Sequence, residues 1–282
     1  MGLIFHGQSD SRLRFLSLLR FKERKTKEMK FYAMACGRLR VRKNVFIPDA
    51  NKNLFIEIPL PIFLITHPQG NVLFDTGPHP DVFKDAFARW GGLAKAFQPV
   101  GNESDGVLSQ LAKIGVRSDS IRYVVNSHLH FDHAGGNEFF SYATFLVSGK
   151  ELAFAKNPDN EGKGYFQADW DHLLDYQEVD GQFDIFGDGR LVIAPMPGHT
   201  LGHQILVVTL NEQETFILSG DSVPFKEHYY DFIVARNNLD NDQALKSVKN
   251  LHALVEAEKA FLIHGHDPDP WEEIKKAPDY YG

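Results

Sequence analysis

Four potential metal ligands lie within a six-residue stretch in the middle of this chain. The stretch reads His-x-His-x-Asp-His and consists of His128, His130, Asp132 and His133. If a strand ends here, its alternation sends His128 and His130 to the same side, and Asp132 continues that alternation. Neutral imidazoles and carboxylates are good ligands for zinc and similar divalent ions. Because four ligands so close in sequence cannot easily surround one ion, the spacing favours two adjacent metal sites.

Three segments further along the chain supply more potential ligands. They contain His199, then Asp221, and then His264 with His266. Each segment follows a run of residues typical of a strand, so each is expected at a strand end, where a rigid scaffold often holds functional residues. The two oxygens of a carboxylate can bridge two cations, which makes Asp221 a candidate bridging ligand.

The elements that position these residues are indicated by the pattern of apolar side chains. Runs rich in β-branched and aromatic residues predict strands at 31–36, 54–58, 62–66, 71–77, 121–125, 144–147, 191–194, 204–210, 215–218 and 260–263. Apolar residues at helical spacing predict helices at 107–114, 149–156 and 242–258. Aromatic residues among glycines and charges mark 78–100 as a candidate lid. This order of elements suits two mixed β-sheets packed together with helices outside.

Size and composition restrict the class of protein. With 282 residues, 43% of them hydrophobic, the chain can bury one large core or two small ones. The net charge of −7 repels phosphate backbones, so we expect no nucleic-acid partner. Cys36 is the single cysteine, so no internal disulfide can form, and no apolar run is long enough to cross a bilayer. We therefore expect a cytoplasmic protein without a membrane span.

The first 29 residues differ from the rest of the chain. Basic residues alternate there with leucine and phenylalanine, which makes the segment a poor secretory signal. We interpret 1–29 as a basic, poorly ordered N-terminal extension and 30–282 as the folded domain. The alternative interpretation of the extension is a helix that lies on a membrane surface.

Together these motifs resemble the metallo-β-lactamase superfamily, and in particular its N-acyl-homoserine lactonase-like branch. The resemblance runs from about residue 30 to residue 267 and rests on the segments 72–77, 127–137, 197–204, 220–221 and 264–267. It implies an α+β fold, a four-layer αβ/βα sandwich of two mixed β-sheets with outer helices and the metals at one edge. It also implies that 30–282 is a hydrolase domain and that the protein forms a homodimer.

Carried over by motif, the resemblance assigns a ligand set for two divalent metal ions. The first ion takes His128, His130 and His199, the second takes Asp132, His133 and His266, and Asp221 bridges both. His264 is left as a neighbour, because the family motif places its ligand directly before the aspartate that is Asp267 here. Asp75 and Asp267 are expected to orient imidazoles. The ions are expected to be zinc, with iron, manganese or cobalt as alternatives.

The implied reaction is attack on the carbonyl carbon of a lactone or related ester. Two divalent ions roughly 3.5–4 Å apart can share a hydroxide and lower its pKa toward neutrality. Asp132 and His133 are expected to act in catalysis as well as in metal binding, with Asp132 orienting the nucleophile. No serine or cysteine nucleophile is needed, in agreement with the absence of a Gly-x-Ser-x-Gly motif. The expected small-molecule substrate is an N-acyl homoserine lactone, which makes quorum quenching the expected role.

One position departs from the family pattern. In the lactonases of this branch, a tyrosine that helps to hold the substrate carbonyl follows the bridging aspartate by three residues. Here that position is Pro224, which has no hydroxyl group. His228, Tyr229 and Tyr230 follow a few residues later and are the candidates to reach the same space.

Other functions on the same kind of centre stay open. They are a thioester or ester hydrolase resembling the type II glyoxalases, a mononuclear iron persulfide dioxygenase, and a non-catalytic metal-binding module. A β-lactamase is disfavoured because Cys36 lies far upstream of the cluster, and a nuclease because the net charge is negative. A flavin-containing diiron protein is disfavoured because His130 stands where those proteins have glutamate.

Overall fold

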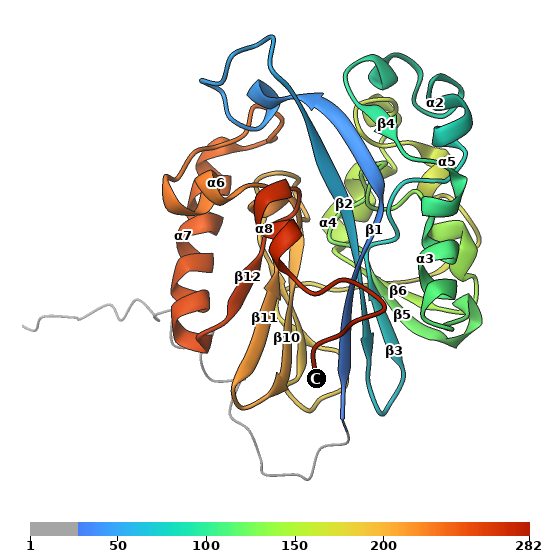
Figure 1. Cartoon of the computed structure of the whole chain (residues 1–282), viewed down its shortest axis with the longest axis vertical. Helices are drawn as coiled ribbons and strands as arrows, with labels where there is room; N and C mark the ends of the chain where they lie inside the picture. Colours follow the sequence, from blue (N-terminus) through green and yellow to red (C-terminus); the bar gives the residue numbers. More distant parts are fainter. Residues whose placement is uncertain (1–27) are drawn as a thin grey trace, which may run out of the picture.

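A computed structural model describes residues 28–282 and shows two β-sheets packed together with helices on the outside (Figure 1). The seven-stranded sheet has the order β4-β1-β2-β3-β5-β6-β7, and the five-stranded sheet has the order β12-β11-β10-β9-β8. The predicted four-layer sandwich is confirmed. The prediction for residues 1–29 lies outside the described residues except at positions 28 and 29. Within 28–282, no helix is long and apolar enough to cross a membrane.

The first sheet is mixed, as predicted. Its strands are Lys30–Arg42 (β1), Phe55–Thr66 (β2), Asn71–Phe74 (β3), Gln98–Val100 (β4), Ile121–Val125 (β5), Thr144–Val147 (β6) and Asp175–Glu178 (β7). Strands β1 to β4 pair antiparallel, whereas β3, β5, β6 and β7 run parallel. The prediction of two strands at 54–58 and 62–66 is wrong, because both belong to β2. Pro59 and Pro61 lie where β2 pairs with β1 alone, so no strand on the other side requires their missing N–H groups.

The second sheet is also mixed and encloses the main core together with the first. Its strands are Phe183–Asp184 (β8), Leu191–Pro195 (β9), Gln204–Asn211 (β10), Glu214–Leu218 (β11) and Phe261–Ile263 (β12). Only the β11–β12 pair is parallel among its ladders. Phe31 and Leu146 of the first sheet share a buried cluster with Ile193, Leu206 and Leu218 of the second. Burial of this apolar surface holds the two sheets together.

Helices cover both outer faces of the sandwich (Figure 1). They are Val82–Trp90 (α2), Val107–Lys113 (α3), Gly149–Ala155 (α4), Gln167–Trp170 (α5), Lys226–Tyr230 (α6), Asn241–Glu258 (α7) and Pro268–Glu273 (α8). Asp240 directly precedes helix α7, and its side chain accepts the N–H of Gln243 and so caps the helix. Its apolar face, with Val248 and Leu251, packs on the second sheet. Helix α2 lies within the segment predicted as a lid.

The segments with the seven potential ligands follow four strand ends, and Asp75 follows a fifth. Asp75 follows β3, the His128–His133 stretch follows β5, His199 follows β9, Asp221 follows β11, and His266 follows β12. Strands β3 and β5 are parallel neighbours, as are β11 and β12, so their carboxyl ends meet at the same edge of each sheet. The N–H of Gln204 donates to the carbonyl of Ser127 (2.9 Å) and joins the two edges directly. The fold therefore brings ligands from both sheets to one place.

Candidate metal centre

Seven side chains converge between the two sheet edges in three overlapping groups. The first group is His128, His130 and His199, the second group is Asp132, His133 and His266, and an overlapping set of His128, His133 and Asp221 connects them. Within each group, one ligand atom from every residue lies within 4.8 Å of the others. The structure thus brings together all seven residues that the sequence predicts as ligands.

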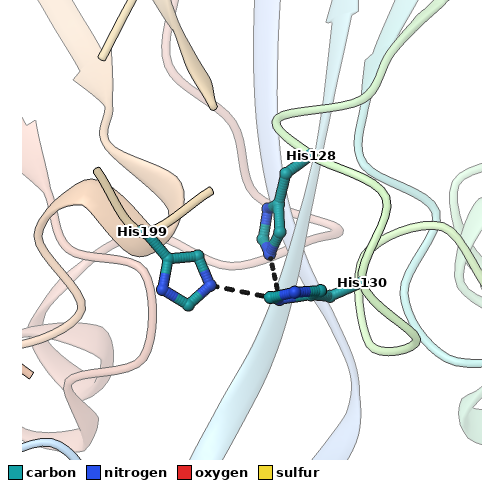
Figure 2. A group of neighbouring side chains, drawn as sticks. All are labelled: His128, His130 and His199. Atoms are coloured by element: carbon teal, nitrogen blue, oxygen red, sulfur yellow. Dashed lines mark hydrogen bonds between the residues drawn. The ribbon is translucent and has the colours of Figure 1, made fainter. Parts of the chain in front are cut away.

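Three imidazole rings form the first group (Figure 2). Nδ1 of His130 lies 3.0 Å from Nε2 of His128 and 3.1 Å from Nε2 of His199. Two rings therefore present Nε2 and the third presents Nδ1 to a common point. Three convergent histidine nitrogens with an open fourth position are typical of a catalytic zinc site.

Asp221 lies between the first group and the second. Its Oδ1 is 2.9 Å from Nε2 of His266 and 3.3 Å from Nε2 of His133. Its Oδ2 is 3.2 Å from Nε2 of His199. One carboxylate oxygen thus faces each group, as a bridging ligand requires. Asp132 completes the second group, with Oδ2 3.8 Å from Nε2 of both His133 and His266.

The hydrogen bonding of this cluster fits a metal centre. Nε2 of His133 and Oδ1 of Asp221 are buried and make no hydrogen bond of good geometry, although they lie 3.3 Å apart. A buried polar atom without a partner destabilises a fold by about 1–3 kcal/mol, so such atoms usually have another function. Here both atoms face the nitrogen and oxygen atoms of other potential metal ligands. The residues present are therefore a suitable donor set for divalent cations.

The protonation states of the first group favour metal binding. Burial lowers the pKa of His128 and of His130 well below the usual 6.5, and the neighbouring histidines lower both further. Both rings are therefore neutral near pH 7 and keep a lone pair for a cation. Burial acts to raise the pKa of Asp221, but the charges of His266 and His199 outweigh it and hold that pKa well below its usual range. The bridging carboxylate is consequently ionised.

The second group holds its protons more tightly. Burial lowers the pKa of His133, but the carboxylates of Asp132, Asp221 and Asp75 outweigh it and raise that pKa well above 6.5. Burial lowers the pKa of His266, but the charges of Asp221 and Asp132 outweigh it and raise that pKa above 6.5. A cation that binds here must displace protons, so its affinity depends on pH.

Asp75 fixes the orientation of His133. Its Oδ2 accepts hydrogen bonds from Nδ1 of His133 (2.8 Å) and from Oγ of Ser127 (2.8 Å), while Oδ1 accepts the N–H of Ser127 (2.7 Å). With Nδ1 donating to Asp75, the Nε2 lone pair of His133 points into the second group. Asp75 has a positive φ of 58°, a backbone conformation that aspartate and asparagine tolerate better than most residues.

Other ligands are oriented by groups that the sequence did not single out. Nδ1 of His266 lies 2.9 Å from the carbonyl oxygen of Pro59, and Nδ1 of His199 lies 3.3 Å from Oδ1 of Asn238. In both rings, Nε2 is thereby left for the metal groups. The N–H of His266 donates to the carbonyl of Pro224 (2.8 Å), so the backbone at this proline supports a ligand. No sequence motif marks these contacts, because two of the acceptors are backbone oxygens.

Two residues predicted to assist the ligands, Asp267 and His264, lie outside the ligand groups. Asp267 accepts the N–H groups of Lys226 (2.9 Å) and Asp269 (3.2 Å) and caps α8, so each of its oxygens accepts a backbone N–H group. A carboxylate directly before a helix is well placed to satisfy free N–H groups. His264 lies outside the three metal groups, and its pKa is lowered to about 4 by burial and by the nearby charges of His228 and Lys226.

The three candidates for the missing tyrosine hydroxyl make their contacts with residues other than the seven ligands. Tyr229 stacks on His252, with ring centroids 3.7 Å apart, and belongs to the buried cluster under α7. Tyr230 is 68% exposed, and its ring contacts Tyr229. Nε2 of His228 lies 3.0 Å from the carbonyl oxygen of Phe46. Packing against α7 and the loop after β1 thus accounts for the positions of these side chains.

Comparisons with known proteins agree with this geometry. A family model for the metallo-beta-lactamase superfamily matches residues 60–271. The N-acyl homoserine lactonases AttM of Azorhizobium caulinodans and of Rhizobium johnstonii are 34% and 33% identical over 260 residues, which cover 90% of this chain and 99% of each relative. The fold is similar to the solved structure of an N-acyl homoserine lactone hydrolase with N-hexanoyl-L-homoserine bound at its catalytic metal centre. That match has a TM-score of 0.83 and 25% identity, and covers 91% of this chain and all of the other. The chain therefore belongs to the metallo-β-lactamase superfamily and, within it, to the N-acyl homoserine lactonase branch.

Proposed function

We propose that this protein is a dinuclear metal-dependent hydrolase that opens the ring of N-acyl homoserine lactones. The observation that carries the proposal is the pair of ligand groups joined by Asp221, with one carboxylate oxygen facing each group. The relatives that match nearly the whole chain are named for this activity. A quorum-quenching role follows from this substrate.

The seven clustered residues would hold two cations, which we propose to be zinc. His128, His130 and His199 would hold the first ion, Asp132, His133 and His266 would hold the second, and Asp221 would contribute to both sites. When bound, the two ions supply Lewis acidity that polarises an ester carbonyl and makes water a better nucleophile at neutral pH. Asp75 keeps His133 in the tautomer that such a site requires.

Asp132 is the group that we assign to proton transfer. Burial raises the pKa of its carboxyl group above the usual 3.8, although the charges of His133 and His266 partly oppose that shift. A carboxylate of raised pKa is a better base, and this one stands at the edge of the second group. It takes the proton of the attacking water and returns it to the alkoxide oxygen that leaves when the lactone C–O bond breaks.

The test combines metal analysis with a measurement of acid release. The protein is purified, its metal content is measured, and proton release is followed with N-hexanoyl homoserine lactone, the lactone of the product bound in the similar structure. We expect two ions per chain and acid release that disappears on chelation and in His130→Ala. His172→Ala is the matched control, because that histidine lies outside the three ligand groups and its Nε2 contacts the carbonyl of Ala168.

The other outcomes separate the remaining functions. Two ions without acid release would contradict the lactone substrate and direct the search to thioesters and other esters. One iron per chain without hydrolysis would refute the proposal and favour a dioxygenase.

A further inference from the structure

A fully buried carboxylate outside the metal groups joins the loops that carry the first group. Glu151, in the first turn of α4, is 0% exposed. Its Oε1 accepts hydrogen bonds from the N–H of Leu129 (3.0 Å) and from the hydroxyl of Tyr165 (2.8 Å). Its Oε2 accepts the N–H of Gly202 (3.1 Å). All three partners are donors, and a carboxylate has acceptor sites for each of them.

The three donors belong to segments that hold ligands of the first group. Leu129 lies between His128 and His130 in the sequence. The ring of Tyr165 packs edge-on against His130, with centroids 4.7 Å apart. Gly202 lies in the loop that follows His199. The Glu151 side chain thus connects the segments that contact His130, after strand β5 of the first sheet, to the loop of His199, after strand β9 of the second sheet.

Two glycines allow these segments to approach so closely. A Cβ atom on Gly202 would lie 2.5 Å from the backbone nitrogen of Glu151. A Cβ atom on Gly164 would lie 2.9 Å from Cδ2 of His130, and Gly164 has a φ of +100°. The carbonyl of Gly164 accepts the N–H of Phe131 (3.0 Å). The ring of His130 is therefore confined between the Gly164 backbone and the Tyr165 ring.

We propose that Glu151 is a positioning residue that sets the separation of His130 and His199 and thereby the affinity of the first metal site. The proposal rests on the proposed metal centre. Groups that orient ligands in this way typically change metal affinity about 10–100-fold when they are mutated. A carboxylate with a purely structural role would instead lower the stability of the fold and leave the metal affinity unchanged.

The informative variant is Glu151→Gln, which keeps the shape of the side chain. An amide has one oxygen and one NH2 group, so it can accept hydrogen bonds either from Leu129 and Tyr165 or from Gly202, but not from both sides. With its oxygen facing Leu129 and Tyr165, its NH2 group opposes the N–H of Gly202, donor against donor. The loop of His199 then loses its hydrogen bond. We expect one metal ion to be bound about 10–100-fold more weakly.

Two further variants make the test specific. Tyr165→Phe removes one donor and keeps the ring against His130, so we expect a smaller loss of affinity at the same site. Asp169→Asn is the matched control, because Asp169 is a buried carboxylate that pairs with Arg89 and lies outside the metal groups.

The experiment is a cobalt(II) titration of the full-length protein against a chelator of known affinity, read by the visible spectrum of the bound ion. If the wild-type protein does not bind two ions, the proposed centre fails independently of Glu151. If it does, the inference is supported when Glu151→Gln lowers the cobalt affinity of one site and the affinity of the other site equals that in Asp169→Asn. It is overturned if Glu151→Gln binds both ions as tightly as Asp169→Asn does. Should Glu151→Gln fail to fold, unchanged cobalt affinity in Tyr165→Phe overturns it, and weakening of one site supports it.

Discussion

Replacement of Asp75 by asparagine isolates one hydrogen bond of the metal centre. Asp75 lies at a φ of 58°, and asparagine accepts this left-handed conformation as readily as aspartate, so the backbone is expected to keep its shape. The amide oxygen can still accept the N–H of Ser127. The NH2 group then takes the place of Oδ2, the oxygen that accepts a hydrogen bond from Nδ1 of His133 in the wild-type protein. His133 must then accept at Nδ1 and carry its proton on Nε2, the atom that faces the second group.

The expected size of the effect follows from the lost interaction. Hydrogen bonds to charged groups contribute about 1.5–3 kcal/mol. Since about 1.4 kcal/mol corresponds to a factor of ten, the second metal ion should bind roughly 10–140-fold more weakly in Asp75→Asn. This range overlaps the 10–100-fold that is typical for groups that orient a metal ligand.

The assay is zinc affinity by chelator competition, with Asp75→Ala as a companion variant. Alanine at positive φ adds a backbone penalty of about 1–2 kcal/mol, so Asp75→Ala should lose fold stability as well as affinity. When both are metal-free, Asp75→Asn should unfold at a higher urea concentration than Asp75→Ala, because only the alanine variant carries this backbone penalty. Wild-type zinc affinity in a folded Asp75→Asn protein would show that His133 does not depend on this carboxylate, and the reasoning would be refuted.

Three further predictions concern other parts of the site and the core. Gly164→Ala should lower metal affinity, because its Cβ atom would press on His130 from 2.9 Å and its φ of +100° disfavours alanine; unchanged chelator competition would contradict this. Burial raises the pKa of the Cys36 thiol, so Cys36 should react with a thiol reagent only after denaturation, and rapid labelling of the native protein would argue against its buried position. In the metal-free protein, the raised pKa values of His133 and His266 contribute stability that is complete below about pH 6.5 and is lost as the pH rises through the raised values. The free energy of unfolding in urea should therefore fall from pH 6.5 to 9, and a constant value over this window would exclude charged imidazoles in the folded state.

Much of the fold could be predicted where apolar patterns are strong. The strands at 121–125 and 144–147 have the same bounds in the structure as in the prediction, because their runs of valine, isoleucine and phenylalanine are buried and end sharply. Strand β7 could not be predicted, since Asp175–Glu178 is polar and largely exposed and becomes a strand only by pairing with β6. Pro59 divided β2 in the prediction, although a proline is compatible with a strand that lacks one neighbour.

The candidate site could also be predicted only in part from the sequence. The ligand stretch at 128–133 could be recognised because its residue types and spacing are rare, and the structure brings it together with His199, Asp221 and His266. The groups behind the ligands could not be recognised. Glu151 looks like a surface residue of a short helix in the sequence, and only the tertiary structure shows that it is buried beneath two loops. The role of the Pro59 carbonyl has no side-chain signal at all.

The placement of the ligands on two sheets has a consequence for the integrity of the fold. The chain has one cysteine and therefore no internal disulfide, but each proposed metal ion would tie a residue of the 128–133 stretch to one much later in the chain. Each ion would thus act as a reversible cross-link that closes a long loop. A ligand that binds only the folded state at 1,000 times its dissociation constant stabilises it by about 4.1 kcal/mol. Scarcity of the ion would then reduce not only turnover but also the number of folded molecules, and metal supply would determine how long each molecule survives proteolysis.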